Sequence, residues 1–161
     1  MTISVGAKLP DVTFKTMTGE GASEVTTEEL TSGRKVVIFG VPGAFTPTCN
    51  GNHLPGFLAA VDDFKQKGID EIAVVAVNDM FVMDAWAKSS APDGTITFLA
   101  DGSAEFTRAT GLELDASGFG MGIRSKRYAM FVDDGVVKVL NIEDVPTEAE
   151  KSSASTLLSA I

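Results

Sequence analysis

The chain has 161 residues, of which 44% are hydrophobic and 22% are charged. This length and composition predict a single folded domain over residues 1–161 and exclude wholesale disorder. The formal net charge of −9 argues against a nucleic-acid partner, because nucleic-acid-binding proteins cluster Lys and Arg against the phosphates.

The N-terminal segment carries no targeting pattern that we recognise. Residues 1–14 lack the apolar core of a signal peptide and the Arg-rich pattern of a transit peptide. No apolar run approaches the roughly 18 residues that a membrane helix requires. We therefore expect a cytoplasmic protein with no membrane partner. The chain has one cysteine, so it cannot form an internal disulfide.

The N-terminal part is predicted to be an irregular lead-in to the first strand. Residues 1–35 show a possible short hairpin around Thr18 and Gly19, and residues 26–30 read as a helical turn that a threonine caps. The apolar run 36–39 predicts the first buried strand.

A helix and a central strand are expected next. Apolar residues recur at spacings of three and four from Leu54 to Phe64, which predicts one apolar helix face ending near Gly68. Pro55 predicts a kink or a short first segment in that helix. The continuous apolar run 72–77 predicts a strand that is covered on both faces.

Two further helices and a third strand follow along the chain. Asn78 and Asp79 supply caps for a helix with its apolar residues on one side, namely Phe81, Val82, Ala85 and Trp86. Residues 96–99 predict a short strand, and residues 101–103 cap a short helix that ends near residue 111.

The C-terminal part predicts a loop, a hairpin and a last helix. The glycine-rich stretch 112–123 reads as a loop, and strands 128–132 and 136–142 flank a turn at residues 133–135. A final helix is expected within 152–161. The order of strands and helices predicts an α/β fold with a mixed central sheet flanked by helices, arranged as in thioredoxin.

Cys49 stands where the first strong strand passes into a helix. The free N–H groups and the dipole of a helix start favour an anion, and the thiolate is the reactive form of cysteine. The alternative is a small buried hydrophobic residue. The polar neighbours Asn50, Gly51 and Asn52 favour an accessible, reactive thiol instead.

Three neighbours of Cys49 are candidates for a supporting role. Thr46 lies three residues earlier, within reach of the sulfur or of a bound oxygen, although it also suits a turn or a cap. Pro42 fixes the backbone and could shield a thiolate, or it simply ends the strand. His53 is a candidate for stabilising the thiolate or acting as a base, but such a histidine is more often a packing residue.

A reactive thiolate also needs a cation, and the residue pattern leaves its identity open. The candidates by local context are Arg108, Arg124, Lys126 and Arg127. Arg127 begins the hairpin strand, so its guanidinium fork would be aimed by a fixed backbone. One histidine and one cysteine are too few ligands for a metal site, and we expect no metal and no cofactor.

The residues from Pro42 to Cys49 carry the pattern P-x-x-x-T-x-x-C, and this resembles the peroxiredoxin signature. Together with the segments 53–57, 77–79 and 124–128, the chain is similar to the type II, peroxiredoxin-5 group over nearly its whole length. The resemblance implies a thioredoxin-like fold with Cys49 as the peroxidatic cysteine. It places the remaining functional positions of the family on Pro42, Thr46 and Arg127, with Arg124 as a supporting candidate.

The resemblance also implies a reaction and its partners. Hydrogen peroxide and alkyl hydroperoxides are the expected substrates, with Phe45 and Thr48 as substrate-binding candidates and Phe119 and Met121 as further parts of an apolar collar. Some members of this branch carry a second, resolving cysteine, but Val74, Ser152 and Ser153 occupy such places here. An external thiol, from glutathione with glutaredoxin or from thioredoxin, is therefore expected to complete the cycle. A homodimer is expected from the resemblance alone.

A different class of function fits the same cysteine. A redox-responsive binding or holdase protein would need a reactive Cys49 that senses oxidant, but it would not need Thr46 and Arg127 as a pair. A structural thioredoxin-like module would need neither a reactive Cys49 nor the pair of Thr46 and Arg127.

Overall fold

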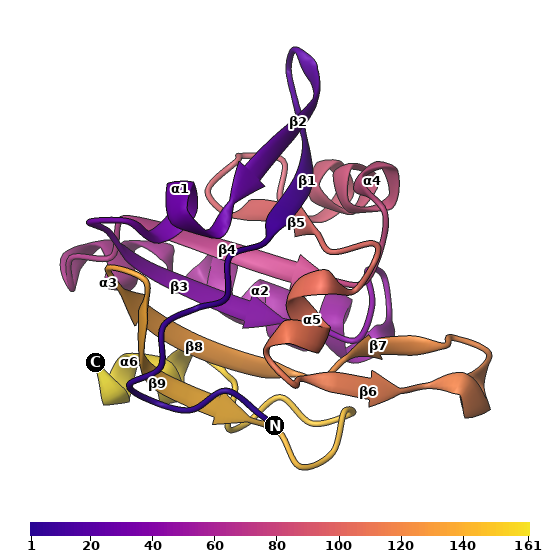
Figure 1. The fold of residues 1–161 in the computed structure, drawn as a ribbon. Coiled ribbons are helices and arrows are strands. Elements are labelled where there is room, and N and C mark those ends of the chain that lie inside the picture. Colours follow the sequence, from indigo (N-terminus) through magenta and orange to yellow (C-terminus); the bar gives the residue numbers. More distant parts are fainter.

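The computed structural model describes all 161 residues and is built around one seven-stranded sheet with the order β2-β1-β5-β4-β3-β8-β9 (Figure 1). Its strands are β1 (Thr13–Thr18), β2 (Gly21–Thr26), β3 (Lys35–Gly40), β4 (Glu71–Ala76), β5 (Thr97–Ala100), β8 (Tyr128–Asp133) and β9 (Val136–Ile142). Strands β3, β4 and β5 pair in parallel, whereas β8 is antiparallel to β3 and β9. This is the mixed central sheet that the sequence predicts.

Helices cover both faces of the sheet. Along β3, Val37 and Phe39 point into one apolar core and Val36 and Ile38 into the other, as the two-residue period of a strand requires. The first core includes residues of α2 (Leu54–Ala59), α3 (Val61–Gln66), α4 (Met80–Ser90) and α6 (Ala154–Ala160). The second includes residues of α1 (Thr27–Thr31) and α5 (Glu105–Ala109), which lie on the near side in Figure 1.

The N-terminal segment is more regular than the sequence predicts. Strands β1 and β2 pair over six residues each, and β1 joins the main sheet through Lys15 and Ala100 of β5. The hairpin expected around Thr18 and Gly19 is confirmed. The expectation of an otherwise irregular lead-in was wrong, because these half-exposed strands carry many polar residues and give a weak apolar signal. The threonine cap of α1 is confirmed: Thr26 Oγ1 accepts from Glu29 N at 3.0 Å, and Thr26 N donates to Glu29 Oε1 at 3.3 Å.

The buried side of α4 differs from the predicted one. Met83 and Trp86 are its buried residues, whereas Phe81 is 65% exposed. Phe81 and Trp86 are five positions apart, which turns them about 140° from each other around the helix. The predicted cap is confirmed, because Asp79 accepts from the backbone N–H groups of Phe81 and Val82.

The region predicted as a loop contains a second, small sheet. Strands β6 (Glu113–Asp115) and β7 (Ile123–Ser125) pair antiparallel around the short helix η2 (Ser117–Phe119). Three-residue strands next to glycines have no apolar run that a sequence pattern could detect. The other C-terminal predictions are confirmed, including the tight turn between β8 and β9, where Asp134 and Gly135 have φ values of 49° and 78°.

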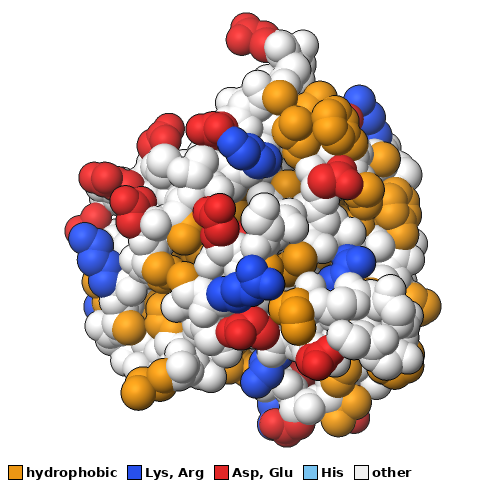
Figure 2. Space-filling view, turned by 45° about the vertical axis from the view of Figure 1, so that its right-hand side comes forward, with side chains coloured by type: hydrophobic (Ala, Val, Ile, Leu, Met, Phe, Trp, Pro, Cys, Tyr) orange, Lys and Arg blue, Asp and Glu red, His pale blue; other side chains and the backbone are white.

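The surface is charged without a dominant basic area on the face shown in Figure 2, where acidic and basic side chains are interspersed with hydrophobic ones. No helix is both long enough and apolar enough to cross a membrane.

Candidate active site

Pairing between β3 and β8 creates the site. Because the two strands are antiparallel, the last residue of β3, Gly40, lies opposite the first residue of β8, Tyr128. The chain leaves Gly40 into the loop that leads to Cys49, and Arg127 precedes Tyr128. A Cβ atom at Gly40 would lie 2.0 Å from the Tyr128 ring, so only glycine lets the two strands meet in this way.

Cys49 begins the π-helical turn η1 (Cys49–His53), which continues into α2. Leu54 N donates to Cys49 O across this wider turn. Pro55 follows immediately and has no N–H to donate, so a regular α-helical ladder could not run through this point. The interruption that the sequence predicts at Pro55 is therefore confirmed. Cys49 is fully buried, and the expectation of an accessible thiol was wrong, because the side chains that contact the sulfur also cover it.

Two polar side chains contact the Cys49 sulfur. Thr46 Oγ1 lies 2.8 Å from Sγ, and Arg127 Nη2 donates to Sγ at 3.1 Å. Thr46 Oγ1 also lies 2.7 Å from the carbonyl oxygen of Gly43. One hydroxyl proton can serve only one of these acceptors. The hydroxyl can thus accept from a thiol while donating to Gly43, or donate to a thiolate.

The structure selects one arginine among the cation candidates. Arg127 is 2% exposed and is the only one of them that contacts Cys49. Arg124 donates instead to the carbonyl oxygens of Met121 and Val77, at 2.9 and 3.1 Å. Arg108 bonds to the Ser103 carbonyl on the surface.

His53 is buried and acts as a hydrogen-bond acceptor for Arg127. Its Nε2 lies 2.9 Å from the Ser152 carbonyl oxygen, which can only accept, so Nε2 carries the proton. Nδ1 is then free to accept from Arg127 Nη1 at 3.1 Å. The pKa of His53 is lowered to about 4, chiefly by burial; the Ser152 hydrogen bond opposes this shift and the Arg127 charge adds to it. His53 is therefore neutral at pH 7 and does not supply the cation for Cys49.

A hollow of about 280 Å³ borders these groups. Thr46 and Arg127 line it, whereas Cys49 does not. Its other lining residues are Pro42, Pro47, Thr48, Leu114, Asp115, Ala116, Phe119, Met121, Pro146 and Thr147. Most of this wall is apolar, and one of its residues, Phe119, is 86% exposed.

Of the two predicted substrate-binding residues, Thr48 and Phe45, only Thr48 lines the hollow. Thr48 lines the hollow, and its Oγ1 donates to the Thr147 carbonyl oxygen at 3.1 Å. Phe45 does not line it: this residue has a φ of 64°, and its ring packs toward Trp86 at a centroid distance of 6.4 Å. The apolar wall comes instead from prolines and from residues 114–121.

Several supporting contacts were missed by the sequence interpretation. Asn50 Oδ1 accepts from Trp86 Nε1 at 2.9 Å and from Ser90 Oγ at 3.1 Å. Asn78 was predicted as a helix cap, but its Oδ1 accepts from Ala44 N at 2.9 Å and so holds the loop before Cys49. Such contacts join distant segments and leave no local pattern.

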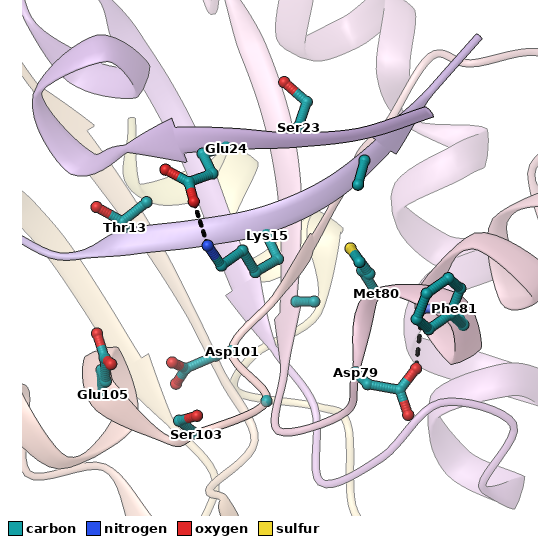
Figure 3. Close-up of a pocket in the computed structure, with 13 residues that line it drawn as sticks. Thr13, Lys15, Ser23, Glu24, Asp79, Met80, Phe81, Asp101, Ser103 and Glu105 are labelled. Carbon is teal, nitrogen blue, oxygen red and sulfur yellow. Dashed lines mark hydrogen bonds and ion pairs between the residues drawn. The ribbon is translucent and has the colours of Figure 1, made fainter. Parts of the chain in front are cut away.

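A second hollow, of about 370 Å³, lies between the β1–β2 hairpin and the starts of α4 and α5 (Figure 3). Its charged groups are largely committed to other contacts: Lys15 pairs with Glu24, Asp79 caps α4 and Asp101 caps α5. Because no thiol lies there, the hollow beside Cys49 is the better candidate for chemistry.

Comparison with known proteins agrees with this choice of site. A family model described as Redoxin matches residues 4–158. The chain is 51% identical over 166 residues to peroxiredoxin-2E-2, chloroplastic, of Oryza sativa subsp. japonica, covering 99% of this chain and 73% of that protein.

Solved structures show the same relationship. The crystal structure of reduced Prx3 in complex with H2O2 from Vibrio vulnificus is 50% identical, with a TM-score of 0.93 and coverage of 99% of both chains. Peroxiredoxin 5 from Alvinella pompejana is 39% identical, with a TM-score of 0.86 and coverage of 98% and 97%. The predicted thioredoxin-like fold is confirmed, and the chain belongs to the peroxiredoxin family, in its type II, peroxiredoxin-5-like branch, as a member with a single cysteine.

Proposed function

We propose that this protein is a thiol peroxidase in which Cys49 reduces hydrogen peroxide and alkyl hydroperoxides. The observation that carries the proposal is the contact between Arg127 Nη2 and Cys49 Sγ in a buried site. Arg127 takes part in none of the four ion pairs of the structure. A buried guanidinium without a carboxylate favours an anion beside it, and the thiolate of Cys49 is the group in place.

The reaction follows from these contacts. The Cys49 thiolate attacks one peroxide oxygen, the O–O bond breaks, and a sulfur–oxygen bond forms. The sulfur is oxidised to a sulfenic acid, while the second oxygen leaves with the bonding electrons and takes up a proton from solvent, giving water or an alcohol. Arg127 offsets the negative charge that moves from sulfur to the leaving oxygen. The Thr46 hydroxyl is placed to bond the peroxide oxygen under attack.

The apolar hollow supports the alkyl hydroperoxide part of the proposal. Its wall offers few polar groups to a substrate tail, and Thr48 lines its edge. Phe119 and Met121 line the hollow, which supports their proposed role in an apolar collar around an alkyl group. A role for Phe45 in substrate binding remains a prediction that rests on the resemblance.

An external thiol completes the cycle in this proposal, because Cys49 is the only cysteine of the chain. The first thiol attacks the sulfenic sulfur, forms a mixed disulfide and releases water, and a second thiol then frees Cys49. Glutathione with glutaredoxin, or thioredoxin, would supply these thiols. Turnover of peroxide with each reductant in separate assays would distinguish them.

A homodimer and a cytoplasmic location are the remaining parts of the proposal. The exposed rings of Phe45 and Phe119 support an association surface beside the site. The location rests on the sequence prediction, and the rice relative is named chloroplastic. Imaging of a fluorescent fusion in the source cells would test it.

The decisive experiment is stopped-flow oxidation of the reduced protein by hydrogen peroxide and by an organic hydroperoxide. Trp86, the single tryptophan, is linked to Asn50 beside Cys49 and so provides the fluorescence signal. Arg127→Ala should lower the second-order rate constant by about 10²- to 10³-fold, the usual effect of losing a donor to developing charge. Cys49→Ser is the control that should not react.

Two results would contradict the proposal, one for the activity and one for the role of Arg127. If the reduced wild-type protein reacted no faster than a free thiol, a peroxidase function would be wrong and an oxidant-responsive binding protein would be the better interpretation. A fast reaction that survived Arg127→Ala would leave the activity but overturn the assigned role of Arg127.

A further inference from the structure

Arg127 is held in place by hydrogen bonds that it donates to uncharged groups, so its direction depends on how firmly those groups are fixed. Its Nε donates to the Pro146 carbonyl oxygen at 2.9 Å, and its Nη1 donates to His53 Nδ1. His53 in turn depends on the Ser152 carbonyl oxygen, which sets its tautomer. The direction of Arg127 therefore depends on the groups that fix Ser152.

Glu143 fixes Ser152 with one carboxylate oxygen. Its Oε2 accepts from Ser152 N at 2.6 Å and from Ser152 Oγ at 2.5 Å. Glu143 is 6% exposed and takes part in no ion pair. Burying a carboxylate without an ion pair is unfavourable unless hydrogen bonds compensate for the lost hydration. The charge-assisted hydrogen bonds that Ser152 donates provide that compensation only while Glu143 and Ser152 both stay in place.

The contacts close into a ring that returns to Arg127. Glu143 N donates to the Arg127 carbonyl oxygen at 2.9 Å, so Glu143 holds the backbone of Arg127 directly. Its side chain reaches the guanidinium of the same residue through Ser152 and His53. The ring joins the start of β8, the end of β9, the segment before α6 and the turn that carries Cys49.

We propose that Glu143 is a positioning residue of the peroxidase site, which sets the direction of the Arg127 guanidinium through Ser152 and His53. This inference rests on the proposed function, since it needs Arg127 to act on Cys49. Glu143 touches neither Cys49 nor the hollow beside it. Its effect must therefore pass through the ring.

The test compares peroxide rate constants of Glu143 variants measured by stopped flow. Glu143→Ala should lower the rate constant by about 10- to 100-fold, as is usual when a group that orients a catalytic side chain is lost. Glu143→Gln retains an oxygen that can accept from Ser152, so it should recover most of the lost rate. If Glu143→Ala folds poorly, Ser152→Ala removes one of the two bonds and should give a smaller loss in the same direction.

A matched control and a coupling measurement separate positioning from general damage. Asp144 is adjacent, exposed and paired with Lys151 on the surface, so Asp144→Ala should leave the rate unchanged. In a His53→Phe background, which keeps an aromatic ring between Phe39 and Phe57 but removes both nitrogens, Glu143→Ala should have little further effect.

The pH profile of the reaction gives an independent signal. With Arg127 turned away, the thiolate form of Cys49 loses its cation, so the rate profile of Glu143→Ala should move to higher pH. The nearby charged groups Lys126, Asp144 and Lys151 are all retained in wild type and Glu143→Ala, so they act as a common background for this comparison.

The outcomes distinguish this inference from the proposed function. A fast wild type with an unchanged Glu143→Ala rate, or an equal loss with and without His53, would overturn the positioning role alone. A slow wild type would overturn the peroxidase function itself.

Discussion

His53 lies between a carbonyl oxygen that accepts from Nε2 and a guanidinium that donates to Nδ1. A protonated ring would have no lone pair for Arg127 and would place a second positive charge beside it. Burial against Phe39 and Phe57 also disfavours the charged ring. These contacts explain why the one histidine near the cysteine serves Arg127 and not the sulfur directly.

The lowered pKa of His53 predicts a pH-dependent stability. In the unfolded chain this ring has its ordinary pKa of 6.5, whereas in the folded protein its pKa is about 4. As pH falls through this window, the free energy of unfolding should therefore decrease by about 3 kcal/mol, with no contribution above it. Denaturant unfolding of the wild type and of His53→Asn at several pH values measures this effect, as a difference in the slope of the unfolding free energy against pH. Identical pH dependence in both proteins would contradict the assignment.

The turn η1 and helix α4 are linked through one asparagine. Asn50 Oδ1 accepts from the buried indole of Trp86 and from Ser90 on α4. This bond holds the turn that carries Cys49 against the body of the protein. Because Cys49 is fully buried, a bulky external thiol can reach its sulfur only when this turn opens locally.

Asn50 should therefore control how easily the turn opens. Asn50→Ala leaves the buried indole N–H without its partner, which costs about 1–3 kcal/mol. We expect alkylation of Cys49 by a bulky reagent to become about 10-fold faster or more, with faster amide exchange over 49–59 but not in β4. Ser90→Ala removes only the longer bond and is the matched control. Unchanged alkylation in Asn50→Ala would show that the turn opens by another route.

For the whole molecule, the sheet order decides which distant segments meet. Strand β3 lies inside the sheet, with β4 parallel on one side and β8 antiparallel on the other. The loop with Cys49 leaves β3 at the edge where β8 begins, and the segment after β9 folds back to Arg127 with Pro146 and Glu143. The apolar hollow and the exposed Phe119 lie at this same site.

Association through this surface predicts a dimer in solution. The chain has a mass of 16.9 kDa, and light scattering should give about twice that mass at micromolar concentration and above. Phe119→Ser should shift the protein toward monomer, because an 86% exposed phenyl ring gains most from burial between copies. Phe81→Ser, at a 65% exposed ring of α4 beside the other hollow, should not. A wild type that is monomeric throughout would rule out the dimer.

The sequence by itself determined the order of strands and helices of the main sheet from β3 onward, the caps at Thr26 and Asp79, and the turn at Asp134 and Gly135. These features depend on residues within a few positions of each other, so their signal is local. The pattern from Pro42 to Cys49 is equally local, which is why it could identify the family.

The family resemblance named Arg127, but only the tertiary structure showed that it contacts the sulfur, what His53 does and that Cys49 is buried. Arg127 lies 78 residues from Cys49 and His53 lies 99 residues from Ser152, so these contacts exist only after β3 and β8 pair and the C-terminal segment packs. The exposed side of α4 at Phe81 and the small β6–β7 sheet were misjudged for related reasons. Packing decides which side of a helix is buried and whether strands of three residues pair. Neither outcome can be read directly from a single sequence.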